Sequence, residues 1–208
     1  MVHVLEKTER RLGEKLFLKG DRCAGAKCAA VRRAYPPGVH GKAGKRRQRG
    51  SEYGALLKEK QKVRFVYGLD ESDISHYSKK AIAQPGVYHV NFLKILENRL
   101  DNAVFRLGFA DSRRAARQAV NHGHIKVGGR VVDIPSYQLK KGEHIRIKES
   151  SAASPMFRSL ETRLKKYTPP KWLHLDKALK EGTVMAEPDV EEIQISIDPT
   201  KIREFYSR

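Results

Sequence analysis

The chain has 208 residues and carries 42 Lys and Arg against 24 Asp and Glu, which gives a formal net charge of +18. Such an excess favours a polyanionic partner, and a hydrophobic content of 39% is enough for a buried core, which excludes a disordered basic tail. No apolar run is long enough to cross a membrane, and residues 1–20 lack the apolar core of a signal peptide. We therefore expect a soluble, cytoplasmic protein with no membrane partner.

The charge is concentrated in two stretches. Residues 22–50 hold nine Lys or Arg and no acidic residue, whereas residues 182–200 hold five acidic residues and no Lys or Arg. A long run of like charges predicts a phosphate backbone as the neutralising partner, although a solvated face is the ordinary alternative. Between Tyr35 and Gly50, two prolines and four glycines disfavour regular structure and predict an extended basic arm. The segment from Arg32 to Gly50 is expected to become ordered only on RNA.

Two helices are expected after this arm. Ser51 can cap a helix that ends at Gly68 and places Leu56 and Val63 on its apolar face. A second, shorter helix is expected from about residue 72 to residue 83, where the sequence Gln-Pro-Gly stops it. The other face of the first helix carries four cations, for which RNA is favoured over solvent: Lys58, Lys60, Lys62 and Arg64.

A third, longer helix is expected to start after Asn91 as a cap and to continue to Gly108 with one apolar stripe. Glu97 and Asp101 lie four residues apart on it. Paired carboxylates serve acid–base catalysis only in a cleft that separates their pKa values. On so basic a chain we interpret them instead as partners that orient neighbouring arginines, such as Arg99 and Arg106.

The next segment predicts a short helix with an unusual start. Ser112 can cap it, and its first two turns carry Arg113, Arg114 and Arg117. Cations at a helix N-terminus oppose the helix dipole, so this crowding predicts an anion there. Free N–H groups together with guanidiniums suit a phosphate.

A small sheet is expected after this helix. The pair Gly128-Gly129 predicts a tight β-hairpin with Lys126 and Arg130 on its polar side. Residues 144–148 predict a further strand after the turn at Gly142. A last helix is expected near residues 157–167, where apolar residues fall in helical register.

These motifs together resemble a known family. Residues 96–147, LENRLDNAVFRLGFADSRRAARQAVNHGHIKVGGRVVDIPSYQLKKGEHIRI, are similar to the S-four (S4) RNA-binding domain. The flanking stretches RRAYPPGVHG, LLKEKQKVRFVYG, PPKWLHLD and EFYSR resemble the bacterial small-subunit ribosomal protein S-four family, so that the similarity covers about residues 16–208. The resemblance implies an α+β fold. A helical N-terminal domain with a basic arm would span residues 1–93, completed by residues 188–208, and an S-four domain with the following helix would span residues 94–187.

The resemblance also implies a structural rather than an enzymatic role. Members bind 16S rRNA at a multi-helix junction, nucleate assembly of the subunit body, contact ribosomal protein five and contribute to the mRNA entry path and to translational accuracy. One alternative is an RNA-modifying enzyme targeted by an S-four domain, but residues after 147 show no glycine-rich cofactor loop. Another is a general basic nucleic-acid binder or ribosome-rescue factor, which a comparison of junction RNA with duplex RNA would separate.

Carried over position by position, the resemblance marks two sets of candidate RNA contacts. The S-four motif gives Arg99, Arg106, Arg113, Arg114, Arg117, His122, His124, Lys126 and Arg130. The arm gives Arg32, Arg33, Tyr35, His40, Arg46, Arg47, Arg49, Ser51 and Tyr53. We expect His122 and His124 to form a turn and contact phosphate rather than a metal, since no third ligand is near in sequence. Tyr35 either stacks on a base or packs on the adjacent prolines.

The two cysteines, Cys23 and Cys28, have the spacing of half a structural zinc site. In the resembled family one bacterial form holds zinc with four cysteines, two of them upstream, and another form has lost them; here residues 1–20 contain no cysteine. Structural zinc needs four protein ligands, and the nearby substitutes are His3 and His40. We therefore predict the zinc-free form, no metal cofactor, and two cysteines that act as packing residues, reduced or bridged.

Overall fold

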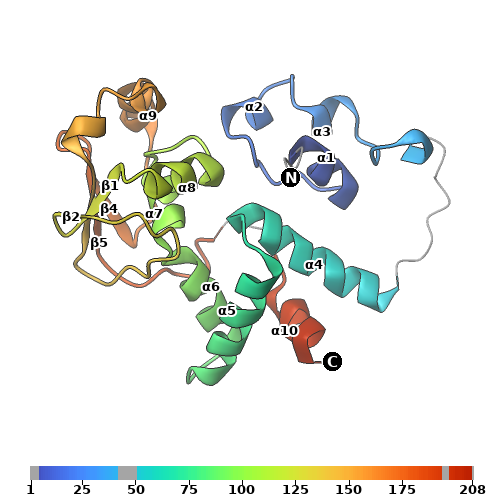
Figure 1. Cartoon of the computed structure of the whole chain (residues 1–208). Helices are drawn as coiled ribbons and strands as arrows, with labels where there is room; N and C mark the ends of the chain where they lie inside the picture. The colour runs from blue at the N-terminus through green and yellow to red at the C-terminus, as the bar shows by residue number, and fades with distance from the viewer. Residues whose placement is uncertain (1–4, 42–50, 194–196, 208) are drawn as a thin grey trace. The chain divides into compact units, whose positions relative to one another are not determined.

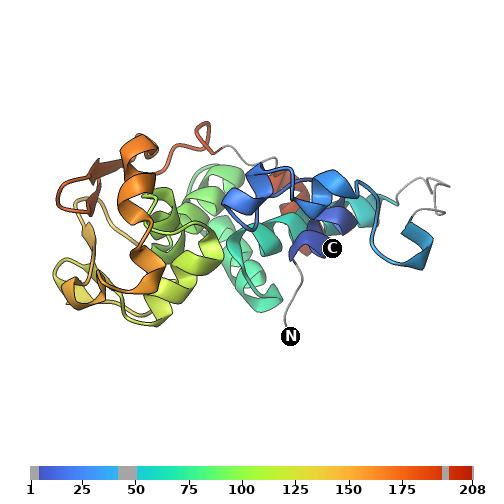
Figure 2. The ribbon, with the colours of Figure 1, turned by 90° about the horizontal axis from the view of Figure 1, so that it is seen from above.

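The computed structural model describes residues 5–41, 51–193 and 197–207. The chain divides into two compact units, one made of residues 1–78 with 197–208 and the other of residues 79–196. Figure 1 labels their helices and strands, and Figure 2 shows the same ribbon from above. Three candidate contacts of the expected arm, Arg46, Arg47 and Arg49, lie outside the described residues. Every helix in the described ranges is too short or too polar to span a membrane.

The first unit is helical. Its long helix α4 (Glu52–Tyr67) lies beside α10 (Pro199–Ser207), which comes from the far end of the sequence (Figure 1). The rings of Tyr53 and Phe205 lie 5.7 Å apart across this pair, and Ile202 is fully buried. The remaining helices are α1 (Leu5–Leu12), α2 (Asp21–Ala24), α3 (Ala29–Arg32), the 3-10 helix η1 (Val39–Gly41) and the start of α5 (Glu71–Ala83), which continues into the second unit.

The second unit packs helices against one antiparallel sheet, whose strand order is β2-β1-β3-β5-β4. The strands are β1 (Ile125–Val127), β2 (Arg130–Val131), β3 (His144–Ile147), β4 (Leu173–Asp176) and β5 (Glu181–Val184). The helices are the end of α5, α6 (Tyr88–Glu97), α7 (Leu100–Arg106), α8 (Arg113–Asn121), η2 (Glu149–Ser151), η3 (Pro155–Phe157) and α9 (Leu160–Lys166). Helices α7, α8 and α9 and the sheet share one apolar core, which includes Trp172. The predicted α+β class is confirmed.

Several helix ends and turns lie where the sequence predicts them. The Ser51 hydroxyl accepts the N–H three residues later at 3.1 Å, and Gly68 closes α4 with a φ of 64°. The Ser112 hydroxyl caps α8 in the same way, at 3.2 Å. The hairpin between β1 and β2 turns at Gly128 and Gly129, whose φ angles of 55° and 83° are strained for residues with a side chain. These predictions depended on local chemistry, and the structure confirms them.

The single helix expected up to Gly108 is instead two helices, α6 and α7. The chain between them is extended at Arg99, whose ψ is 138°. The N–H groups of Leu100 and Asp101 donate to the carbonyls of Tyr137 and Pro135, at 2.9 and 3.2 Å, instead of continuing the helical ladder. The apolar pattern did not reveal the break, because Leu96 before it and Leu100 after it are four residues apart and both buried, as they would be in one continuous helix.

Asn91 does not cap this helix, contrary to the expectation from sequence. It lies inside α6, which starts at Tyr88. Its side-chain amide donates to the carbonyls of Gln84 and Pro85 at 3.2 and 3.1 Å. Asn91 therefore satisfies backbone groups after the end of α5 rather than at the start of α6.

The acidic stretch 182–200 divides between the units. Its first residues belong to β5, which pairs with β3 and β4 in the second unit, whereas α10 begins at Pro199 in the first. The boundaries of 1–93 with 188–208 and of 94–187 stay a prediction about independently folding domains.

Candidate nucleic-acid interface

Helix α8 carries the densest group of expected RNA contacts. Arg114 is exposed and Arg117 is half-buried. Arg113 is held from within the unit, because its Nε donates to Asn102 Oδ1 at 2.8 Å and its guanidinium lies 4.6 Å from the centre of the Phe105 ring. The first turn of α8 is therefore anchored by Arg113 and presents Arg114 to solvent.

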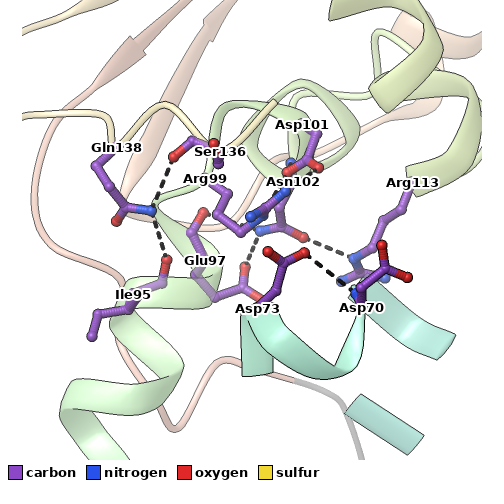
Figure 3. Close-up of polar contacts among 10 residues, drawn as sticks. All are labelled: Asp70, Asp73, Ile95, Glu97, Arg99, Asp101, Asn102, Arg113, Ser136 and Gln138. Atoms are coloured by element: carbon purple, nitrogen blue, oxygen red, sulfur yellow. Dashed lines mark hydrogen bonds and ion pairs between the residues drawn. The ribbon is translucent and has the colours of Figure 1, made fainter. Parts of the chain in front are cut away.

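A buried polar network supports α8 from behind. The fully buried Glu97 carboxylate accepts two hydrogen bonds from the Arg106 guanidinium, at 2.9 and 3.0 Å. The Asn102 amide nitrogen donates to the same carboxylate at 2.8 Å, and its oxygen receives the bond from Arg113 (Figure 3). One chain of hydrogen bonds thus joins α6, α7 and α8 and fixes their relative positions. The expectation that Glu97 orients Arg106 is confirmed.

Arg99 has a different place from the one expected of an RNA contact. Its side chain is 1% exposed, and its Nε and Nη2 donate to the two carboxylate oxygens of Asp101 at 3.0 and 2.7 Å (Figure 3). Asp101 also accepts the N–H of Asn102 at 2.9 Å. A guanidinium so enclosed reaches a phosphate only by leaving its carboxylate, so the structure gives Arg99 a role in the α6–α7 turn.

The hairpin presents its cations unequally. Arg130 is exposed on β2. Lys126 on β1 donates to the Glu149 carboxylate at 2.7 Å, and Arg146 pairs with the other oxygen of that group. Hydrogen bonds from Lys126 and Arg146 lower the pKa of Glu149 to about 2. Among these residues, Arg130 is the cation that the hairpin leaves most open to a phosphate.

The two histidines near the end of α8 are also unlike each other. His122 is exposed, whereas His124 is half-buried, with Nδ1 2.9 Å from the Ser151 hydroxyl and its ring edge-on to Phe157 at 6.0 Å. Their rings lie 5.8 Å apart. In the part of the chain that the structure describes, neither joins a cluster of potential metal ligands.

The cations of α4 are mostly engaged inside the first unit. Lys62 is 4% exposed and pairs with both Glu14 and Glu59 at 2.7 Å. Lys58 pairs with the same Glu14 at 2.7 Å. Burial raises the pKa of Glu14, but the hydrogen bonds from the two lysines outweigh it and lower the pKa overall.

Lys60 is enclosed in the same manner. Its side chain is 7% exposed, and its ammonium lies 2.7 Å from the Glu71 carboxylate and 4.1 Å from the centre of the Phe205 ring. Lys60 therefore joins α4 to α5, and Lys62 joins α4 to the segment after α1, so the structure does not offer either of them to RNA. Arg64, on the same helix, is half-buried.

The segment before the arm shows a contact that the sequence did not indicate. The Arg10 side chain donates through Nε to the carbonyls of Arg33 and Tyr35, at 2.9 and 3.0 Å, and its guanidinium lies 4.9 Å from the centre of the Tyr35 ring. Tyr35 thus packs under a cation, which neither of its two expected roles included. The exposed candidates in this unit are Arg32, Arg33, His40, Ser51 and Tyr53.

Both cysteines are buried beside a residue that sequence reasoning missed. Ligand atoms of Glu9, Cys23 and Cys28 lie within 4.8 Å of one another. A closed zinc site needs four donors, and among the described residues this group supplies three. One Glu9 oxygen already accepts the N–H groups of Leu16 and Leu18, at 3.1 and 3.2 Å, and burial raises the pKa of the Cys23 thiol, whereas zinc binds the thiolate. The residues present do not fit a structural zinc ion, and the absence of metal stays a prediction.

Two family models match the chain in succession, "Ribosomal protein S4/S9 N-terminal domain" over residues 3–97 and "S4 domain" over residues 98–145. A relative from Desulfitobacterium hafniense strain Y51, named small ribosomal subunit protein uS4, is 50% identical over 199 residues, which cover 96% of this chain and 94% of the relative. The chain belongs to the uS4 family. Relatives of that name from Halothermothrix orenii and Syntrophomonas wolfei are 50% and 48% identical over the same shares.

This uS4 membership confirms the family that the sequence resembles, which is a family of ribosomal proteins and not of enzymes. The two family models meet between residues 97 and 98, at the start of the turn that separates α6 from α7. The buried pair of Arg99 and Asp101 follows directly. The residues that fix this turn therefore open the segment that the S4 domain covers.

Proposed function

We propose that this uS4 protein is a structural constituent of the small ribosomal subunit and binds 16S rRNA directly. The observation that carries the proposal is the S4-domain surface in which Arg114 and Arg130 are exposed while Arg113 and Arg106 are fixed from behind by Asn102 and Glu97. Exposed cations on an immobilised frame are suited to the fixed spacing of a phosphate backbone.

The electrostatics of α8 support the same proposal. Its first turn carries two cations, Arg113 and Arg114, next to the positive end of its own helix dipole, and the first turn contains no acidic residue. This arrangement costs a few tenths of a kcal/mol in an isolated helix and becomes favourable once an anion is bound. A net charge of +18 adds long-range attraction for RNA, because binding releases counterions from the phosphates.

The proposed contacts are a reduced form of the set expected from sequence. Within the described residues they are Arg32, Arg33, His40, Ser51, Tyr53, Arg64, Arg114, Arg117, His122, Lys126 and Arg130. Arg46, Arg47 and Arg49 remain proposed contacts outside those residues. Lys58, Lys60, Lys62, Arg99, Arg106 and Arg113 are assigned to ion pairs and hydrogen bonds that hold the protein surface in shape. His124 and Tyr35 are assigned to packing.

The wider role is proposed from the family resemblance. We propose that the protein acts in the cytoplasm, within the ribosome, at a multi-helix rRNA junction, where multivalent cations lower the cost of bringing several phosphate backbones together. Nucleation of the subunit body, contact with ribosomal protein five, a place along the mRNA entry path and an influence on translational accuracy are parts of this proposal that the family resemblance supports.

The experiment compares two double variants with equal loss of charge. Arg114→Gln with Arg117→Gln removes the exposed Arg114 and the half-buried Arg117 of α8, and Lys165→Gln with Lys166→Gln removes two exposed lysines of α9 as the control with equal loss of charge. Binding to a 16S rRNA junction fragment is measured across salt concentrations. Each phosphate contact contributes about 0.7–0.9 to the log–log salt slope and about 1.5–3 kcal/mol to binding. Loss of two contacts should therefore weaken binding by more than about 100-fold and flatten the slope.

The control should change both quantities far less. Equal losses in the two variants would mean that net charge, and not the α8 surface, drives binding. Equal affinity of the unchanged protein for the junction and for plain duplex RNA would favour a general basic binder instead.

A further inference from the structure

The loop between α1 and α2 holds a bulky aromatic residue in a conformation that favours glycine. Phe17 has a φ of 55°, in the left-handed region, and its side chain is 57% exposed. A phenylalanine that is both strained in its backbone and more than half exposed contributes little to the stability of the fold through its ring. Such strain is characteristic of positions kept for binding.

The strain is imposed by bonds on both sides of Phe17. Glu9, which is 1% exposed, accepts the N–H of Leu16 at 3.1 Å and the N–H of Leu18 at 3.2 Å with one carboxylate oxygen. The next N–H along the chain, that of Lys19, donates to Cys23 Sγ at 3.3 Å. These bonds tie the backbone on either side of residue 17 to a buried carboxylate and a buried thiol, so the loop holds the aromatic ring outward.

The surroundings of this ring are cationic. The Lys15 ammonium lies 4.7 Å from the centre of the Phe17 ring, and Arg11, Lys15 and Lys19 are all exposed. Leu16 and Leu18, beside Phe17 in sequence, are half-buried, and the exposed side chains that flank them are those of Lys15 and Lys19. An apolar pocket on another protein would require exposed apolar neighbours around the ring. An aromatic face beside ammonium groups matches an unpaired nucleotide, whose base stacks and whose phosphate takes the charge.

We propose that Phe17 is a stacking contact for an unpaired base of the bound RNA, that Lys15 pairs with the adjoining phosphate, and that Glu9 is the positioning residue that holds the ring out. This inference rests on the proposed function, since the RNA is the one that the whole protein binds. The family resemblance implies rRNA binding by the N-terminal domain as a whole, and the inference assigns a base contact to the loop before α2, where the sequence gave no candidate residue.

The test uses the full-length protein and the same 16S rRNA junction fragment. Phe17→Leu removes the aromatic face but keeps an apolar, equally strained side chain, and Phe17→Tyr is the matched control that keeps the ring. Phe17→Leu should weaken binding by about 5- to 150-fold, the equivalent of about 1–3 kcal/mol per stacked base, with an unchanged salt slope because no cation is lost. Phe17→Tyr should bind as the unchanged protein does, and Lys15→Gln should flatten the slope by about 0.7.

The positioning role of Glu9 has its own readout. Glu9→Leu leaves two N–H groups without their acceptor and frees the loop, so Phe17→Leu added to Glu9→Leu should weaken RNA binding no further. A Glu9→Leu protein that does not fold leaves the Phe17 comparison decisive, because residue 17 is exposed and its variants keep the core.

The outcomes separate the two proposals. If the unchanged protein does not prefer the junction RNA, the proposed function fails. If Phe17→Leu binds RNA with full affinity while Arg114→Gln with Arg117→Gln does not, the base-stacking inference alone is overturned. Full RNA affinity combined with weaker incorporation into particles containing other ribosomal proteins would reassign Phe17 to a protein partner.

Discussion

The buried pair of Arg99 and Asp101 allows a sharp test of how the α6–α7 turn is held. The side chains are 1% and 5% exposed and are joined by two hydrogen bonds, so Asp101→Asn leaves a buried guanidinium without its counter-charge. Removing one partner of a buried ion pair costs about 3–5 kcal/mol. Asparagine keeps one acceptor oxygen, which places the expected loss of unfolding free energy at the lower end, about 3 kcal/mol.

The assay is urea-induced unfolding, with tryptophan fluorescence as the signal. The sequence contains one Trp, and Trp172 is 4% exposed in the core of the second unit, so its emission reports this unit. With a urea m-value of about 1–3 kcal/mol per M, the unfolding midpoint should fall by about 1–3 M. The exposed Asp133→Asn in the same unit should change the free energy of unfolding by less than about 0.5 kcal/mol.

A double variant separates charge from packing. Arg99→Met with Asp101→Leu replaces both charged groups with apolar ones and should recover most of the lost stability, because the penalty arises from the unpaired charge. If Asp101→Asn unfolds at the same urea concentration as the unchanged protein, the pair does not hold the turn and our account of Arg99 is refuted.

Three further predictions concern other parts of the chain. A Cβ on Gly182 would lie 2.3 Å from Leu107 Cδ1, so Gly182→Ala should lower the unfolding free energy of the second unit by about 1–3 kcal/mol in the same fluorescence assay, and an unchanged midpoint would contradict the close packing. The pKa of Glu149 is lowered to about 2 in the folded protein, so its contribution to stability is full above the unfolded value near 4.5 and is lost as pH falls through about 2. The stability difference from Glu149→Gln should therefore shrink over that window and in high salt, and a difference as large at pH 2 as at pH 7 would argue against it. Elemental analysis of protein purified without chelator should find no stoichiometric zinc, whereas one zinc per chain that is lost in Cys23→Ser would overturn our reading of the cysteines.

The parts of the fold that the sequence predicted are those decided within a few residues. Ser51 and Ser112 cap helices, and Gly68 closes one, because each acts on backbone groups three or four positions away. The break at Arg99 was missed because its hydrogen-bond acceptors come from residues 135–137, far along the chain. The helical spacing of apolar residues gives no information about hydrogen-bond acceptors so far along the chain.

The candidate site shows the same division. Arg113, Arg114 and Arg117 were recognised from their spacing alone, but spacing did not distinguish Arg113, which bonds to Asn102, from its exposed neighbour Arg114. Lys60 and Lys62 looked like a solvent-facing row because two of their partners lie outside α4: Glu71 on α5 pairs with Lys60, and Glu14, in the segment after α1, pairs with Lys62. A basic residue in sequence predicts a charge, and only the fold shows whether that charge is already neutralised.

The pairing of α4 with α10 has a consequence for the order of synthesis. Helix α10 follows the whole second unit in the sequence, yet it packs on α4 in the first. During synthesis, α4 therefore emerges from the ribosome long before its packing partner α10. The aromatic contact between Tyr53 and Phe205 cannot form until α10 has emerged. The second unit can fold first, although its residues are synthesised after most of the first unit. A chain that stalls after residue 196 would therefore contain a complete second unit and an incomplete first unit, which quality-control proteases can recognise.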